Sequence, residues 1–385
     1  MGLPELARWA GVKGIDLLGS GDFTHPEWFG TLRGELREES DGIYRYGDAR
    51  FLISGELSAI WSQDGRQRRI HLVVLVPSLD AAERVNRQLS PRGNLAADGR
   101  PMFGLSAKTL VELIWEVAPD AFVIPAHVWT PWYSVFGAKS GFDSLEECFG
   151  SHTDRIAAIE TGLSSDPPMN RRVSRLDRLA LVSFSDAHSP AKLGREATVL
   201  DLPDLTFPAV VGALGGGAGL TGTIEFYPQE GKYHYDGHRQ CGVSWHPTEA
   251  RANGDRCPVC GKELTIGVLH RVDELADRPE DDEATKRDRY WSLIPLVEII
   301  AQALDVGVNT QKAQRAFDAM IDRFGSELGI LLDRPLAEIE RGADGRVAEG
   351  IARMRSGEVR IEPGYDGVYG KIEIPFEEPE QMTLF

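Results

Sequence analysis

Short apolar runs alternate with amphipathic stretches over residues 1–210, a pattern typical of repeated β-α units around a parallel sheet. The apolar runs lie at 14–19, 70–76, 122–126, 156–160 and 180–184. Between them, residues 106–117 place apolar side chains at helical spacing, with Ser106 as the predicted N-cap. The pair Asp64-Gly65 separates two strand-like runs and predicts a hairpin turn. We therefore expect an α/β fold for this part of the chain.

Beyond the α/β pattern, the chain changes character several times. A glycine-rich stretch follows residue 214, a cysteine cluster comes next, and residues 290–356 carry apolar positions at helical spacing. The predicted units are an α/β domain at 1–215, a zinc-binding module at 223–275, a helical C-terminal domain at 285–375 and an acidic tail at 376–385.

Composition narrows the class of protein. The 385 residues are 42% hydrophobic and 26% charged, which excludes a disordered or membrane-embedded chain. The net charge of −17 argues against non-specific coating of nucleic acid but leaves room for a local basic groove. Four cysteines are too few for a disulfide scaffold. No apolar run approaches the ~18 residues of a membrane span, and no secretory signal is recognisable at the start, so we expect a cytoplasmic protein with no membrane partner.

Carboxylates and imidazoles recur where the apolar runs begin or end. They are Asp22, Glu56, His71, His127, Glu160, Asp186 and His188. In α/β barrels such groups converge at the C-terminal ends of the strands. Together they are the ligands that divalent cations such as zinc and manganese accept, and such a centre activates water and neutralises a phosphate. Any one of them alone could instead be a turn cap or a core histidine, whereas the set favours a metal centre.

The cysteine cluster predicts a second, different metal site. His238-x2-Cys241 and Cys257-x2-Cys260 form two ligand pairs separated by fifteen residues. Four such ligands make a closed tetrahedral zinc site, which is structural because no position stays open for water. His246 is the alternative to His238 as the fourth ligand.

Other features concern binding partners. Arg171, Arg172 and Arg175 follow a helical spacing that suits either phosphate contacts or a solvated salt-bridging face. Tyr365 and Tyr369 either stack on DNA or pack within a turn.

The extreme C-terminus has a pattern of its own. Gln381, Leu384 and Phe385 end the acidic tail and resemble the motif that binds the bacterial sliding clamp, although the apolar pair could instead fold back onto its own domain.

Several segments carry a family resemblance. GSGDFTHPEW, SGELSAIW, PAHVWTPW, AIETGLSSDP and SFSDAHSP resemble the metal-binding segments of the PHP superfamily and, more narrowly, those of endonuclease Q. The resemblance implies a PHP-type (β/α)7 barrel with a multinuclear centre of zinc, manganese or magnesium. It also implies an enzyme that nicks DNA on the 5′ side of deoxyuridine, deoxyinosine, deoxyxanthosine and abasic sites.

The resemblance assigns roles to residues as well. The implied metal ligands are Asp22, Glu56, His71, His127, Asp186 and His188, with Glu160 as a ligand or a substrate contact. Glu56 and Asp186 are the implied catalytic groups. The zinc-binding module and residues 362–374 also resemble that family.

One element of the family pattern has no counterpart in the sequence. PHP proteins open with a strand bearing His-x-His, whereas this sequence starts within the expected first helix. We therefore expect a start codon further upstream.

Two alternatives to the endonuclease function stay open. They are a PHP-type phosphatase acting on a small phosphate ester and a catalytically impaired DNA-binding scaffold.

Overall fold

The computed structural model describes residues 1–97 and 100–376. The strands are β1 (Leu18–Gly19), β2 (Arg37–Ser40), β3 (Ile43–Tyr46), β4 (Ala49–Gln63), β5 (Arg66–Val76), β6 (Met102–Phe103), β7 (Phe122–Pro125), β8 (Ala158–Glu160), β9 (Ala180–Val182), β10 (Ala197–Leu200), β11 (Leu220–Glu225), β12 (Asp236–His238), β13 (Val243–Trp245), β14 (Tyr290–Ser292), β15 (Arg360–Glu362) and β16 (Lys371–Glu373).

The α-helices are α1 (Leu3–Lys13), α2 (Pro26–Glu35), α3 (Leu79–Leu89), α4 (Ala107–Val117), α5 (Leu145–Phe149), α6 (Pro167–Arg171), α7 (Phe207–Leu214), α8 (Pro247–Ala252), α9 (Val268–Leu275), α10 (Leu296–Ala303), α11 (Gln311–Phe324), α12 (Leu336–Glu340) and α13 (Gly345–Ser356). Short 3-10 helices occupy Gly150–Arg155, Ser174–Leu176, Pro190–Lys192, Pro228–Glu230, Arg239–Cys241 and Glu283–Lys286, and a π-helical turn occupies Gly329–Asp333.

A mixed seven-stranded sheet dominates the α/β part. Its order is β2-β3-β4-β5-β7, with β1 and β6 both pairing in parallel with β4. Asp64 and Gly65 turn β4 into β5 with φ angles of 52° and 73°, as a two-residue hairpin requires, so the predicted turn is confirmed. The predicted parallel sheet is wrong beyond this hairpin, because β7 pairs antiparallel with β5.

The strand pairing does not close into a barrel within the described residues. β8 pairs in parallel with β9 as a separate ribbon, and β10, β11 and β14 form a third sheet. A closed barrel needs continuous hydrogen bonding around its circumference, and among the described residues β7 pairs only with β5. The structure therefore shows a mixed α/β fold without the closure that the (β/α)7 prediction calls for.

Helix α4 forms where the apolar spacing predicts it. Ser106 caps it by accepting a hydrogen bond from the backbone N–H of Thr109 at 3.1 Å. Leu110 and Ile114 are fully buried on one face of the helix, beside α3. The periodicity prediction is confirmed for this element.

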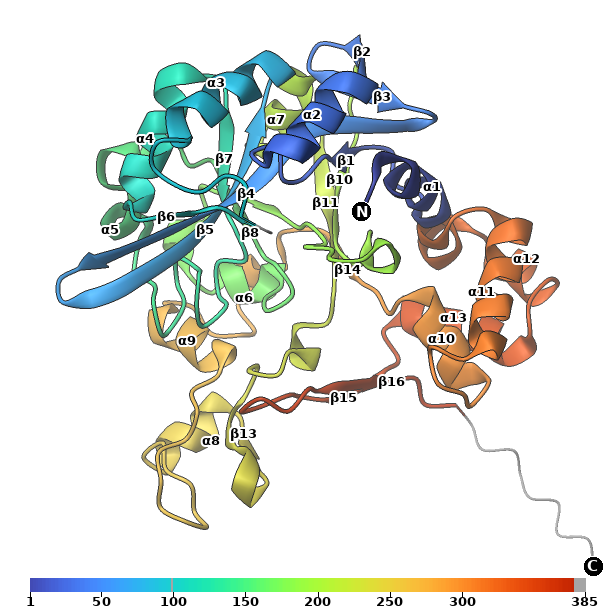
Figure 1. Cartoon of the computed structure of the whole chain (residues 1–385). Helices are drawn as coiled ribbons and strands as arrows, with labels where there is room; N and C mark the ends of the chain where they lie inside the picture. Colours follow the sequence, from blue (N-terminus) through green and yellow to red (C-terminus); the bar gives the residue numbers. More distant parts are fainter. Residues whose placement is uncertain (98–99, 377–385) are drawn as a thin grey trace, which may run out of the picture.

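Three regions have separate apolar clusters. The α/β part buries the largest one, and α10–α13 surround a second that includes Leu296, Ile299 and Ile351. A small cluster around Val243 and Cys257 supports the segment that carries β13 and α8. In Figure 1 the β15–β16 hairpin runs between this segment and the helices α10 and α13. Among the described residues, no helix has both the length and the apolar character that crossing a membrane requires.

Candidate metal centre and cysteine cluster

Glu56, His71 and His127 meet at one face of the large sheet. Glu56 on β4 and His71 on β5 are diagonal neighbours on that face, and His127 follows β7 directly. Oε1 of Glu56 lies 2.9 Å from Nδ1 of His71 and 3.3 Å from Nε2 of His127. The two imidazole nitrogens are 3.1 Å apart. All three ligand atoms lie within 4.8 Å of one another, an arrangement that suits a shared cation.

The charges of this group support the same interpretation. Burial alone would raise the pKa of Glu56, but hydrogen bonds from His127 and His71 hold that pKa below its ordinary value. Burial lowers the pKa of His71, whereas Glu56 outweighs burial at His127 and raises its pKa. The donor set consists of one carboxylate and two imidazoles, a combination of ligand types that fits a divalent cation.

Three of the predicted residues have left-handed backbone. The φ angles are 42° at Asp22, 31° at His127 and 42° at Asp186. Burial raises the pKa of Asp22, against the opposing charge of Arg100. Oδ1 of Asp186 lies 3.6 Å from Nε2 of the largely exposed His188. Asp22, Asp186 and His188 thus surround the Glu56 group but are not part of its close cluster.

Glu160 at the end of β8 holds His127 through the backbone. Its Oε2 accepts the His127 N–H at 2.7 Å, and burial raises its pKa to about 7. Gly162 then passes so close that a Cβ there would lie 2.5 Å from Cβ of His127, and its φ of 62° also favours glycine. Glu160 therefore fixes the position of His127.

Sequence reasoning missed three residues of this site. Arg100 reaches both Glu56 and Asp186, and Tyr133 stacks on His71 at a ring distance of 4.5 Å. Arg195 donates to the carbonyls of Ser185 and Asp186 at 2.8 and 3.2 Å. These residues lie in loops, where no hydrophobic periodicity points to them. For Arg100 the sequence offered one local signal, the turn-forming Gly-Arg-Pro stretch before β6.

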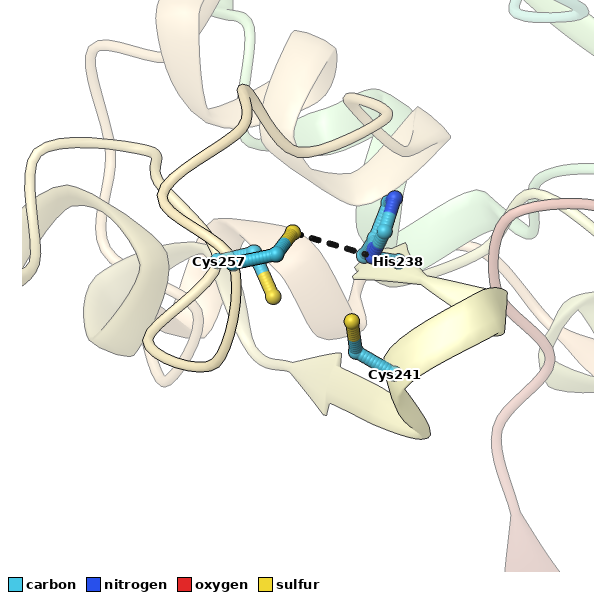
Figure 2. A group of neighbouring side chains, drawn as sticks. His238, Cys241 and Cys257 are labelled. Carbon is cyan, nitrogen blue, oxygen red and sulfur yellow. Dashed lines mark hydrogen bonds between the residues drawn. The ribbon is translucent and has the colours of Figure 1, made fainter.

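The cysteine cluster is brought together by two separate turns. Figure 2 shows the side chains of His238, Cys241 and Cys257 converging. Together with Cys260, their ligand atoms lie within 4.8 Å of one another, and Sγ of Cys260 is 3.7 Å from Nδ1 of His238. The alternative histidine, His246, instead caps α8 by accepting the N–H of Thr248.

Two of the predicted DNA contacts are corrected by burial. Arg171 is 2% exposed, and its guanidinium bonds Asp288 at 2.5 Å and two backbone carbonyls. Arg172 pairs with Asp273 and Glu280. Because α6 ends at Arg171, the expected helical face does not form, and neither guanidinium is free for a phosphate. Arg175 is exposed and stays a candidate.

The two predicted tyrosines differ in exposure, and the predicted clamp motif falls outside the described residues. Tyr365 packs against Gly237 and forms a backbone bridge to Tyr235, so it belongs to a packed turn. Tyr369 is 68% exposed. The clamp-motif residues Gln381, Leu384 and Phe385 lie outside the described residues.

This chain is similar to one family model and to two proteins of known sequence. The family model described as the MJ0043 C-terminal domain matches residues 295–358. An uncharacterized protein from Bacillus subtilis, YqxK, is 31% identical over 373 residues, covering 94% of this chain and 89% of that protein. The uncharacterized protein MJ0043 of Methanocaldococcus jannaschii is 32% identical over 250 residues, which are 63% of this chain but only 31% of that protein.

Two solved structures share the whole fold. The crystal structure of PfuEndoQ, a lesion-specific endonuclease from Pyrococcus furiosus, matches with a TM-score of 0.86 and 30% identity, covering 97% of this chain and 91% of that chain. An endonuclease Q complex with a 27-mer duplex bearing an abasic lesion at the active site matches with a TM-score of 0.83 and 30% identity, covering 97% and 92%. The shared fold and the 30% identity extend over nearly the full length of this chain and of both solved structures, so all three belong to one class of mixed α/β proteins. The chain belongs to the endonuclease Q family.

Proposed function

We propose that this protein is a DNA repair endonuclease that hydrolyses the phosphodiester on the 5′ side of abasic sites and of deoxyuridine, deoxyinosine and deoxyxanthosine. The observation that carries the proposal is the convergence of Glu56, His71 and His127 beside Asp186, in a chain that shares its fold with an endonuclease bound to abasic DNA.

Glu56, His71 and His127 would hold a divalent cation, either zinc, manganese or magnesium, with Asp186, Asp22 and His188 beside it. Such a cation supplies an activated water and compensates the negative charge of the phosphodiester. Glu160 keeps His127 in place through its backbone N–H, and Thr130 Oγ1 lies 3.1 Å from Nδ1 of His127, which orients the ring. The fold likeness further supports a PHP-type arrangement of β1–β9.

The second cluster has a structural role in this proposal. His238, Cys241, Cys257 and Cys260 supply four ligands, so a zinc ion there would have no open position. Its effect would be to hold the β12–β13 hairpin against the turn after α8. This small region buries few apolar side chains, and it would therefore depend on the metal for its stability.

An exposed aromatic surface next to the catalytic group supports binding of DNA. Trp132 is 42% exposed and packs edge-on to Tyr233 at a ring distance of 6.1 Å. Nζ of Lys232 lies 5.7 Å from the rings of both Tyr233 and Tyr369. Tyr133, the neighbour of Trp132, contacts His71. Unstacked bases bind such aromatic faces, and a lysine beside them attracts the phosphates, so we assign this surface to the strand that flanks the lesion.

The proposal also includes the sliding clamp as a partner. Gln381, Leu384 and Phe385 end the chain with one amide and two large apolar groups, a combination suited to a clamp pocket. Deletion of residues 381–385 should abolish clamp binding while leaving cleavage of a short duplex unchanged. Clamp binding by the truncated protein would contradict this part of the proposal.

The proposed activity is tested with duplexes that carry one abasic site, one deoxyuridine or no lesion, incubated with manganese or magnesium. We expect a single nick 5′ to the lesion, and loss of at least 100-fold in rate on Asp186→Asn, because this change removes a carboxylate from the centre. Asp204→Asn, the same change at an exposed aspartate, is the matched control. Phosphate release from small esters without nicking would favour the phosphatase alternative, and binding without cleavage would favour the scaffold.

A further inference from the structure

The Arg100 guanidinium contacts several members of the carboxylate and histidine group. Its Nε lies 2.6 Å from Oε2 of Glu56, and one terminal nitrogen lies 3.0 Å from Oδ1 of Asp186. The other terminal nitrogen lies 3.4 Å from Nδ1 of His71. The guanidinium thus contacts two of the implied cation ligands through charged hydrogen bonds and a third through its imidazole.

The backbone that carries Arg100 is held while its side chain reaches the surface. Pro101 accepts the N–H of Ser58 at 3.0 Å, and β6 then pairs with β4, so the residue is anchored beside the strand that bears Glu56. The Arg100 side chain is 26% exposed. The position therefore lies at the rim of the centre, between the carboxylates and the solvent from which DNA would enter.

Arg100 and a divalent cation compete for the same charge. Asp186 and Glu56 have a limited number of lone pairs, and a guanidinium near a dication repels it. If the carboxylates of Glu56 and Asp186 bind a cation, Arg100 loses its two ion pairs. Its positive charge is then uncompensated, although the side chain is partly buried. A phosphodiester restores the balance, since its two free oxygens match the planar fork of an arginine.

Resting on the proposed function, we infer that Arg100 is a cation-gated phosphate-binding residue. Its guanidinium covers Glu56 and Asp186, and where these carboxylates engage a cation it turns to the phosphodiester at the lesion. This assignment gives Arg100 two opposing effects, because it weakens cation binding and strengthens the hold on the substrate. A residue that only supported the ligands would strengthen both.

The test measures the two effects separately on the full chain. Manganese affinity is measured by calorimetry on protein that is stripped with a chelator and then reloaded with one equivalent of zinc, because zinc favours the cysteine cluster whereas manganese favours the oxygen-bearing centre. Cleavage of a duplex with one abasic site is measured at saturating manganese. The variants are Arg100→Ala and Arg100→Lys, and Arg92→Ala, an exposed arginine of the same loop, is the matched control.

We expect Arg100→Ala to bind manganese about tenfold more tightly and to cleave about 100-fold more slowly. Arg100→Lys keeps the charge but loses the fork, so its manganese affinity should stay near that of the unmodified protein and its cleavage should fall about tenfold. Arg92→Ala should match the unmodified protein in both. Equal melting temperatures would show that all variants fold.

Unchanged or weaker manganese binding by Arg100→Ala would overturn the inference, whatever its cleavage rate, and so would tighter binding with undiminished cleavage. The proposed function is judged on the unmodified protein instead. If that protein does not nick abasic DNA, the proposed function fails and the phosphate role of Arg100 fails with it, whereas tighter manganese binding by Arg100→Ala would still demonstrate the competition.

Discussion

A buried ion pair between Lys13 and Glu327 links the first helix of the α/β part to the helical region. The side chains are 6% and 4% exposed, so solvent screens the pair very little. The other carboxylate oxygen of Glu327 accepts the backbone N–H of Leu296 at 2.9 Å, at the start of α10. Replacing Lys13 with methionine removes the cation and leaves a buried carboxylate that has one hydrogen bond.

Removing one partner of such a pair costs about 3–5 kcal/mol, because the remaining charge loses its compensation without regaining water. Lys13→Met should therefore destabilise the contact between α1 and α10 by that amount. Adding Glu327→Gln to it should recover most of the loss, since the amide oxygen still accepts the Leu296 N–H. The exposed pair of Lys286 and Glu283, 2.7 Å apart, is the matched control, and Lys286→Met should cost less than about 1 kcal/mol.

Pulse proteolysis in increasing urea, read by mass spectrometry, measures the loss of stability caused by Lys13→Met and reports which segment opens first. We expect Lys13→Met to expose cleavage sites in α10–α13 at lower urea, with the double variant close to the unmodified protein. A loss under about 1 kcal/mol for Lys13→Met, or a double variant as unstable as the single one, would refute the argument from burial.

Three further predictions concern other parts of the molecule. Burial raises the pKa of Glu225 to about 8, so the contribution of its neutral carboxyl to stability is fully present below about pH 4.5 and is lost as pH rises toward 8. Glu225→Gln should flatten the fall in unfolding free energy over this range, measured by urea unfolding at pH 5 to 8. Cys260→Ser should lose bound zinc and raise hydrogen exchange in β12 and β13 but not in α4, and unchanged zinc content would contradict the four-ligand site. Trp132→Ala and Tyr369→Ala should each weaken binding of abasic duplex by about 1–3 kcal/mol in fluorescence anisotropy, whereas equal affinity would remove the aromatic surface from the DNA path.

The sequence pattern predicted local elements better than their pairing. Helix α4 and the Asp64-Gly65 turn follow from spacing and turn chemistry alone, and both form. Strand direction does not follow from periodicity, because an apolar run reads the same in either direction. The parallel sheet was therefore expected where β7 runs antiparallel to β5, whereas β8 and β9 do pair in parallel.

The same limit applies to side chains. Residue type at strand ends was enough to bring Glu56, His71 and His127 into consideration together. Arginine spacing carried no information on burial, so it left phosphate contacts and a solvated salt-bridging face open for Arg171 and Arg172. Both side chains are buried instead and bond acidic groups of residues 273–288. Arg100 has no periodic context at all, and only its position next to Glu56 and Asp186 reveals it.

Backbone strain coincides with the residues that carry the chemistry. Asp22, His127 and Asp186 all have positive φ, a conformation that costs non-glycine residues of order 1–3 kcal/mol and persists only where surrounding contacts impose it. Those contacts are present at two of the three: Glu160 holds the N–H of His127, and Arg195 holds the carbonyl of Asp186. Glycine at these positions would relieve the strain but supply no ligand, so the left-handed turns are best explained as the means of directing these side chains toward Glu56. The stability of the buried sheet thus maintains a geometry at the strand ends that local preference alone would not produce.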